Sequence, residues 1–325
     1  MFIHPSFLLF FIFLVFSIIF TVSSNSWLFA WMGLEMNLLS FIPIILKKLN
    51  KYSTEAAIKY FLVQAISSIF FLFFFLFLKH YLIITLLLIL MFKMGAAPFH
   101  QWMPSISEGL SWASLFMLLI LQKMAPLILT SFLMKPSAIF YLMQVFIYSS
   151  ALVGSIGGLA HTSLRKILVF SSISHLSWIL ASFLVTNWAW LNYFFIYSLI
   201  LFSLMFSLYM TEIFTINDLL MKNKTSISAL ITISIMSMGG LPPFSGFLPK
   251  FIVIQPLILN NLYFLLLFLL MSTFISLFFY SRMFLSVLLL KNSLNIQNFN
   301  SVYSPAFMFF NISILFLPSF FFMLM

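Results

Sequence analysis

Long apolar segments, separated by short polar stretches, follow one another along almost the whole chain. A helix that crosses a bilayer needs about 20 apolar residues. Spanning segments must satisfy their backbone groups within the protein, and the short alternating segments of a membrane barrel are absent. We therefore predict an all-α fold, a polytopic membrane bundle of about eleven helices at residues 5–22, 26–46, 55–78, 81–110, 112–133, 137–158, 163–184, 188–213, 226–256, 260–289 and 303–324.

Two of these spans, 81–110 and 226–256, contain helix-breaking residues in their interiors. Proline removes a backbone donor and clashes with the preceding turn, and glycine relaxes the backbone. An isolated case is usually an ordinary proline kink, but these two spans are an odd number of spans apart and so run in opposite directions. This pairing favours antiporter-like inverted repeats with two broken helices and an ion path at the breaks. The expected broken-helix positions are Gly95, Pro98, Gly239, Gly240, Pro242 and Pro243.

The chain has no linker long enough to separate soluble domains, so we predict a single transmembrane domain over residues 1–325. Repeat 1 is expected at about 5–133, repeat 2 at about 137–289, and a C-terminal helix at about 303–324. Composition agrees, because 64% of the residues are hydrophobic and only 6% are charged. A soluble protein carries about 25% charged residues.

The net charge of +10 would suggest nucleic-acid binding in a soluble protein. Here the basic residues lie in short loops or inside spans, which makes a nucleic-acid partner improbable. The sequence has no cysteine, which excludes disulfides, cysteine-held iron–sulfur clusters and c-type haem attachment.

The loop charges predict the orientation of the chain. An odd number of spans places the two termini on opposite sides of the membrane. The N-terminal side then carries eight basic residues and the other side two, and the richer side is the cytoplasm or matrix. The eight are Lys47, Lys48, Lys51, Arg165, Lys166, Lys222, Lys224 and Lys291, and the two are Lys79 and Lys135.

Further charged residues fall inside the spans. An ionised group at the bilayer centre costs at least ~2.5–3.5 kcal/mol, so such groups must face protein or water. Glu35 is too short to reach the interface from mid-span. Lys93 and Lys250 lie beside the two expected breaks, and Lys123 lies in mid-span.

Two other basic residues inside spans have simpler explanations. Lys59 follows Glu55 by four residues and is expected to pair with it on the helix surface. Arg282 lies near a span end, where a long side chain can reach the lipid headgroups.

This set of buried charges suggests proton transfer. Burial disfavours the charged form of a lysine and a nearby carboxylate favours it, so a lysine between the two influences can take up and release a proton. His100, two turns after Lys93, and His175, on a polar helix face, are further candidates for the path. His175 fits a satisfied interhelical hydrogen-bond cluster equally well. The histidines lack metal-ligand spacing, and no metal site is expected.

Several of these segments resemble subunit 2 of mitochondrial NADH–ubiquinone oxidoreductase, respiratory complex I, a member of the antiporter-like subunit family. The resemblance covers about residues 20–255, and the last ~70 residues match by hydropathy only. The phenylalanine-rich, cysteine-free composition looks like the animal, arthropod-like form. The matching segments include Trp31-Met32-Gly33-Leu34-Glu35-Met36-Asn37, residues 53–62, 93–100, 122–126 and 164–175, and Gly239-Gly240-Leu241-Pro242-Pro243.

The resemblance implies a core membrane-arm subunit in the mitochondrial inner membrane, with its N-terminus in the matrix and its C-terminus on the intermembrane-space side. It implies a proton path through Glu35, Lys93, Lys123 and Lys250. Flavin, iron–sulfur clusters, NADH and ubiquinone are then bound elsewhere in the complex, and this chain carries no cofactor and no redox active site. The implied partners are other membrane-arm subunits, lipids and protons, without nucleic acid.

Two other functions fit the charged pattern. A stand-alone cation/proton antiporter could use the same buried groups without redox partners. A structural spacer of the membrane arm could use them only to hold helices together.

Overall fold

The computed structural model describes residues 5–46, 50–77, 82–134, 137–185, 188–221 and 225–289. The expected span 303–324 lies outside the described residues, as do Lys47, Lys48, Lys79, Lys135, Lys222, Lys224 and Lys291. Over the described ranges, regular structure is helical apart from an isolated bridge between Ser163 and Thr215, so the predicted all-α class is confirmed. The chain divides into two compact units, residues 1–149 and 150–325.

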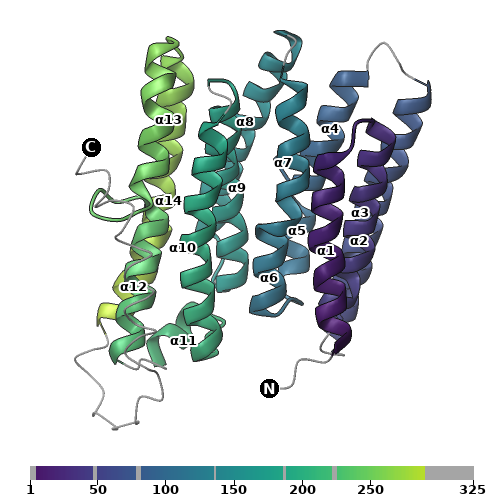
Figure 1. The fold of residues 1–325 in the computed structure, drawn as a ribbon. Helices are drawn as coiled ribbons and strands as arrows, with labels where there is room; N and C mark the ends of the chain where they lie inside the picture. Colours follow the sequence, from purple (N-terminus) through teal and green to yellow (C-terminus); the bar gives the residue numbers. More distant parts are fainter. Residues whose placement is uncertain are drawn as a thin grey trace. The chain divides into compact units, whose positions relative to one another are not determined.

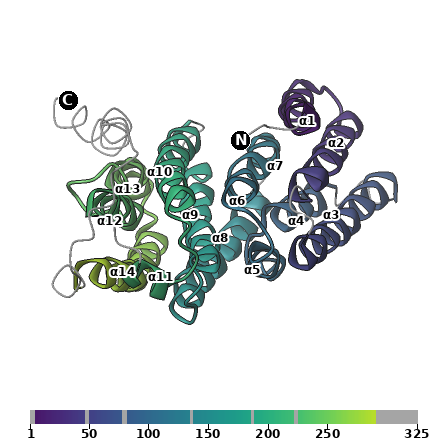
Figure 2. The same cartoon turned by 90° about the horizontal axis from the view of Figure 1, so that it is seen from below.

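The first unit is built around α4, which packs against α3 on one side and α7 on the other (Figure 2). Helix α1 packs on α2, and α2 packs on α3. Its helices are α1 (Pro5–Ser23), α2 (Trp27–Ile45), α3 (Lys51–Phe77), α4 (Leu82–Met94), α5 (Trp102–Ser107), α6 (Trp112–Leu119) and α7 (Leu121–Leu133), and α8 (Ser137–Leu159) begins in it (Figure 1).

Helix α9 (Leu164–Phe183) lies at the centre of the second unit, and 17 of its 20 residues are buried. It packs against α10, α13 and α14, and α12 packs against α10 and α14. The other helices of this unit are α10 (Ala189–Thr211), α11 (Ile216–Met221), α12 (Thr225–Gly239), α13 (Phe247–Leu259) and α14 (Tyr263–Leu289) (Figure 1).

Eight helical segments in the described ranges are long and apolar enough to cross a membrane. Three more, Ile83–Met94, Leu230–Gly239 and Phe247–Leu259, are apolar but shorter. Large apolar side chains are exposed on the long helices, and on α14 they recur every three or four residues, at Phe264, Leu267, Met271, Phe274 and Phe278. An exposed apolar stripe of this kind is suited to lipid rather than water.

The two sequence segments with internal breakers each contain two helices. Residues 81–110 contain α4 and α5, and residues 226–256 fall on α12 and α13. Residues 95–101 separate the first pair, and residues 240–246 separate the second. Both intervening segments open with a glycine in the left-handed region, Gly95 at φ +68° and Gly240 at φ +79°, where other residues are strained.

Candidate functional site

The first unit holds Glu35, Lys93 and Lys123 on three different helices. Glu35 lies near the middle of α2, Lys93 in the last turn of α4 and Lys123 in the first turn of α7. The side chains of Lys93 and Lys123 are buried, at 6% and 2% exposure. Because α4 contacts α7, the fold brings the two lysine-bearing helices together.

Lys93 faces a small polar cavity between α2, α3, α4 and α7. The cavity measures about 10 Å³, which is close to the minimum for one water molecule. Such a water needs two to four polar partners, and this lining supplies them. The lining residues are Leu34, Asn37, Leu38, Tyr60, Gln64, Lys93, Gln122 and Pro126.

Three of the cavity's polar side chains form a hydrogen-bonded chain. The Tyr60 hydroxyl donates to Oε1 of Gln122 at 2.9 Å. Nε2 of Gln122 in turn donates to Oδ1 of Asn37 at 2.9 Å. The Gln122 amide is therefore held between α3 and α2, and we call this arrangement the Gln122 clamp.

Glu35 adds the negative charge of this region. Its Oε1 atom is buried and has no hydrogen-bond partner among the described residues. No ion pair within 4 Å joins Glu35 to Lys93, both of which are described. The carboxylate therefore influences the lysine through space, and a change in their separation would change that influence.

The segment between α4 and α5 begins two residues after Lys93. The side chain of Trp102 donates from Nε1 to the carbonyl of Phe92 at 3.2 Å, and Ser149 Oγ donates to the carbonyl of Ala97 at 2.7 Å. These bonds satisfy carbonyls at and beyond the end of α4, which an uninterrupted helix would satisfy itself. The peptide bond between Ala97 and Pro98 is cis.

Lys250 lies in the second unit, where it bridges the segment between α12 and α13. It is buried, and its Nζ donates to the carbonyl of Gly239 at 2.7 Å. A Cβ atom on Gly240 would lie 2.7 Å from that Nζ. Glycine at position 240 thus serves two needs, a left-handed backbone and space for the lysine.

The two candidate histidines have different surroundings. His175 on α9 is buried, and its Nδ1 is 2.9 Å from the hydroxyl of Tyr193 on α10. This is the interhelical hydrogen bond that the sequence allowed. His100 is partly exposed between α4 and α5, with Nδ1 3.2 Å from the carbonyl of Pro98. A part for either in proton transfer stays a prediction.

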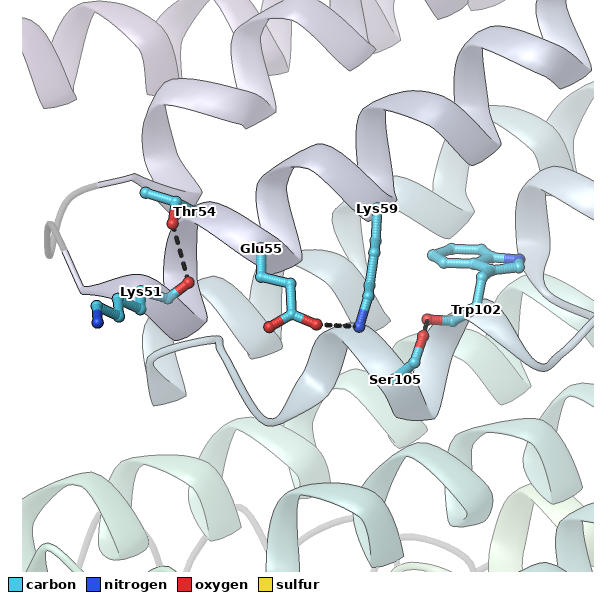
Figure 3. Close-up of polar contacts among 6 residues, drawn as sticks. All are labelled: Lys51, Thr54, Glu55, Lys59, Trp102 and Ser105. Carbon is cyan, nitrogen blue, oxygen red and sulfur yellow. Dashed lines mark hydrogen bonds and ion pairs between the residues drawn. The ribbon is translucent and has the colours of Figure 1, made fainter.

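The expected surface pair is present, because Lys59 Nζ donates to Glu55 Oε1 on the exposed face of α3 (Figure 3). The interpretation of Arg282 needs correction. Its side chain is partly buried and donates to the carbonyls of Leu159 at 3.2 Å and His161 at 2.9 Å. The guanidinium is used to satisfy carbonyls at the end of α8, where the helix leaves them without partners.

The sequence interpretation missed the polar lining of the cavity. Asn37 lies two residues after Glu35, Gln122 directly precedes Lys123, and Tyr60 and Gln64 share one face of α3. Amide side chains in otherwise apolar spans were the available signal, since lipid gives them no partner. Within the described ranges, no group of three or more His, Cys, Asp or Glu residues could hold a metal ion.

Comparison with known proteins relates this architecture to one family. The family model described as NADH:quinone oxidoreductase/Mrp antiporter, TM, matches residues 24–82 and 77–276. NADH-ubiquinone oxidoreductase chain 2 of Anopheles gambiae is 41% identical over 321 residues, covering 93% of each protein. Its counterpart of the same name in Aedes aegypti is 42% identical over 307 residues, covering 89% of each.

A solved structure shares the fold. A chain in the structure of respiratory complex I from Thermus thermophilus with bound aureothin matches with a TM-score of 0.77 and 20% identity. The match covers 96% of the chain described here and 76% of the other chain.

Proposed function

The chain belongs to the NADH-ubiquinone oxidoreductase chain 2 family, and on this premise we propose that it is a core membrane-arm subunit of the proton-pumping NADH:ubiquinone oxidoreductase. It is a multi-pass protein of the mitochondrial inner membrane and contributes a proton path to the complex. One observation carries the proposal. Glu35, Lys93 and Lys123 lie on three helices of one compact unit, and Lys93 faces a polar cavity that residues of all three helices line.

The proposed mechanism uses the separation of Glu35 and Lys93. Electron transfer elsewhere in the complex drives a conformational or electrostatic change in this chain. With the carboxylate close, the ammonium form of Lys93 is favoured and the lysine holds a proton. With the carboxylate distant, burial destabilises the charge, and the proton passes to Lys123 and then along the path that includes Lys250.

The proposed architecture is a single transmembrane domain with eleven spans. Residues about 5–133 and 137–289 form antiporter-like inverted repeats, and about 303–324 form a C-terminal helix. The paired interruptions support this, because each contains a glycine at positive φ and has a buried lysine beside it. The loop charges support an N-terminus in the matrix and a C-terminus on the intermembrane-space side.

The proposed division of labour leaves the redox chemistry to other subunits. Flavin, iron–sulfur clusters, NADH and ubiquinone are bound elsewhere in the complex, and this chain carries none of them. Its partners are neighbouring membrane-arm subunits, lipids and the transported protons. Glu35, Lys93, Lys123, Lys250, His100 and His175 are the proposed path residues.

Lysine substitutions test the proton path. Lys93→Met and Lys123→Met keep a long unbranched side chain and remove the titratable amine. In sealed vesicles containing the intact complex, both variants should lower the number of protons pumped per electron. Lys59→Met is the matched control, because Lys59 is exposed and paired with Glu55, and it should leave the ratio unchanged.

The same experiment separates the alternatives. Normal pumping per electron in both lysine variants would refute the proposed path. If the same variants also assembled poorly, the result would favour a structural spacer. A native gel of mildly solubilised membranes tests the stand-alone antiporter. That reading requires the chain to migrate apart from the large band with NADH dehydrogenase activity.

A further inference from the structure

Lys123 lies beside an irregular point of its own span, in a turn that lacks one backbone hydrogen bond. Helix α6 ends at Leu119 and α7 begins at Leu121, and the dihedrals of Ile120 between them, φ −113° and ψ −67°, lie at the edge of the helical region. The backbone hydrogen bonds from Ile120 N–H to Phe116 and from Met124 N–H to Ile120 are kept. Pro126 has no amide hydrogen, so the carbonyl of Gln122 lacks its usual helical donor. Backbone bonds alone therefore hold the first turn of α7 less firmly than the interior of a regular helix.

The Gln122 clamp supplies the missing support from two other helices. Tyr60 is 2% exposed, and its ring packs edge-on against Phe41 on α2 at 5.1 Å between centroids. This fixes the hydroxyl that donates to Gln122. Asn37, which is 3% exposed, accepts from the other end of the same amide. Gln122 is thus held at both of its polar atoms by buried, well-packed residues.

The clamp also links the charged groups of the proposed path. Asn37 is two residues from Glu35 on α2, and Gln122 is adjacent to Lys123 on α7. Lys93 lines the same cavity as both amides. A displacement of α2 that moves Glu35 therefore pulls on Gln122 through the hydrogen bond from Gln122 to Asn37, and Lys123 moves with its neighbour.

We propose that Gln122 is a positioning residue that couples the position of the Glu35 helix to Lys123. This inference rests on the proposed function and adds a mechanical link to it. Gln122 itself need not carry the proton. Its amide determines where the Lys123 amine stands relative to Lys93 and the cavity, and thus whether proton transfer between the lysines is possible in each state.

Gln122→Met tests this link, because methionine is similar in length and shape and makes neither clamp bond. The readout is the part of proton pumping that depends on Lys123, which is the difference between the wild type and Lys123→Met in sealed vesicles. Loss of one or two hydrogen bonds of typical strength should lower this part about fivefold or more. Tyr60→Phe keeps the ring packing and removes only the hydroxyl, so it should give a smaller decrease. Gln144→Met on α8 makes the same chemical change outside the cavity and should have no effect.

Combination with Lys123→Met distinguishes positioning from general support of the fold. If Gln122 acts through Lys123, the double variant should pump as much as Lys123→Met alone and should assemble equally well. An additive further loss would show that Gln122 acts independently of Lys123 and would overturn the inference. If Gln122→Met prevents assembly, Tyr60→Phe with the same combination provides the test.

The failures of the two proposals are distinguishable. Normal pumping in Lys123→Met refutes the proposed function. Reduced pumping in Lys123→Met, with wild-type pumping in both Gln122→Met and Tyr60→Phe, leaves the proposed function standing and refutes only the part assigned to Gln122.

Discussion

Gly240→Ala is expected to destabilise the second unit through the contact between Lys250 and the end of α12. Alanine at φ +79° costs about 1–2 kcal/mol in backbone strain. Its Cβ would lie 2.7 Å from Lys250 Nζ and 3.0 Å from both Cδ and Cε. The lysine must then leave the Gly239 carbonyl, and the lost hydrogen bond adds about 0.5–1.5 kcal/mol.

Together these effects predict a loss of about 1.5–3.5 kcal/mol in the free energy of unfolding, taking the strain and hydrogen-bond costs as additive. The assay is a heating series on the solubilised complex, in which a native gel and mass spectrometry follow release of this chain. Gly239→Ala is the control, because its Cβ would approach the flexible end of Leu277 closely, at 2.8 Å from Cδ2, and would meet Tyr280 only at ordinary van der Waals distances of 3.6 and 4.0 Å. It should shift the release temperature much less.

A double variant isolates the lysine's part in this effect. In a Lys250→Met background the hydrogen bond to Gly239 is already absent, so adding Gly240→Ala should cost only the backbone strain and the remaining steric contact. Equal costs in both backgrounds would refute the coupling between position 240 and Lys250. A wild-type release temperature for Gly240→Ala alone would refute the whole argument, including the left-handed geometry.

Two further substitutions test side chains that donate to carbonyls at or beyond helix ends. The Ser149 hydroxyl lies 2.7 Å from the carbonyl of Ala97 and 2.8 Å from that of Val145 on its own helix. If it donates to Ala97, Ser149→Ala should lower stability by about 0.5–1.5 kcal/mol, seen as earlier release of the chain on heating. An unchanged release temperature would show that the bond to Ala97 does not contribute. Arg282→Lys cannot span the carbonyls of Leu159 and His161 as the planar guanidinium does, so it should increase hydrogen exchange where α8 ends. Wild-type exchange there would show that one point charge is sufficient.

Hydrophobic patterning was sufficient to predict the helical class and the placement of most helices, because lipid leaves a spanning chain few alternatives. It also singled out Glu35 and Lys123, since both stand far from either end of their apolar segments. The structure buries Lys123 and leaves Glu35 half-buried, with one carboxylate oxygen enclosed. The interruption at Ile120 was not predicted, because an isoleucine between Leu119 and Leu121 carries no breaker signal.

Contacts between distant residues were beyond the reach of the sequence. Gln122 is hydrogen-bonded to Tyr60, which is 62 positions away in the sequence, and to Asn37, which is 85 positions away. No local sequence pattern specifies those pairings. Arg282 shows the same limit, because a local cue suggested the wrong partner. Its place near a span end suggested a headgroup contact, but its partners are carbonyls 123 and 121 positions away. Only tertiary packing decides whether such a side chain contacts lipid headgroups or backbone carbonyls.

The burial of α9 has a consequence for how the chain can diverge among relatives. A helix with one face toward lipid can exchange apolar residues on that face freely, as α14 can along the stripe from Phe264 to Phe278. Helix α9 has almost no such face. Its serine hydroxyls donate hydrogen bonds to carbonyls of the same helix, as Ser171 does to Leu168. Accepted substitutions should therefore show helical periodicity along α14 and be uniformly scarce along α9, so that these two neighbours in one unit would accumulate sequence changes at different rates.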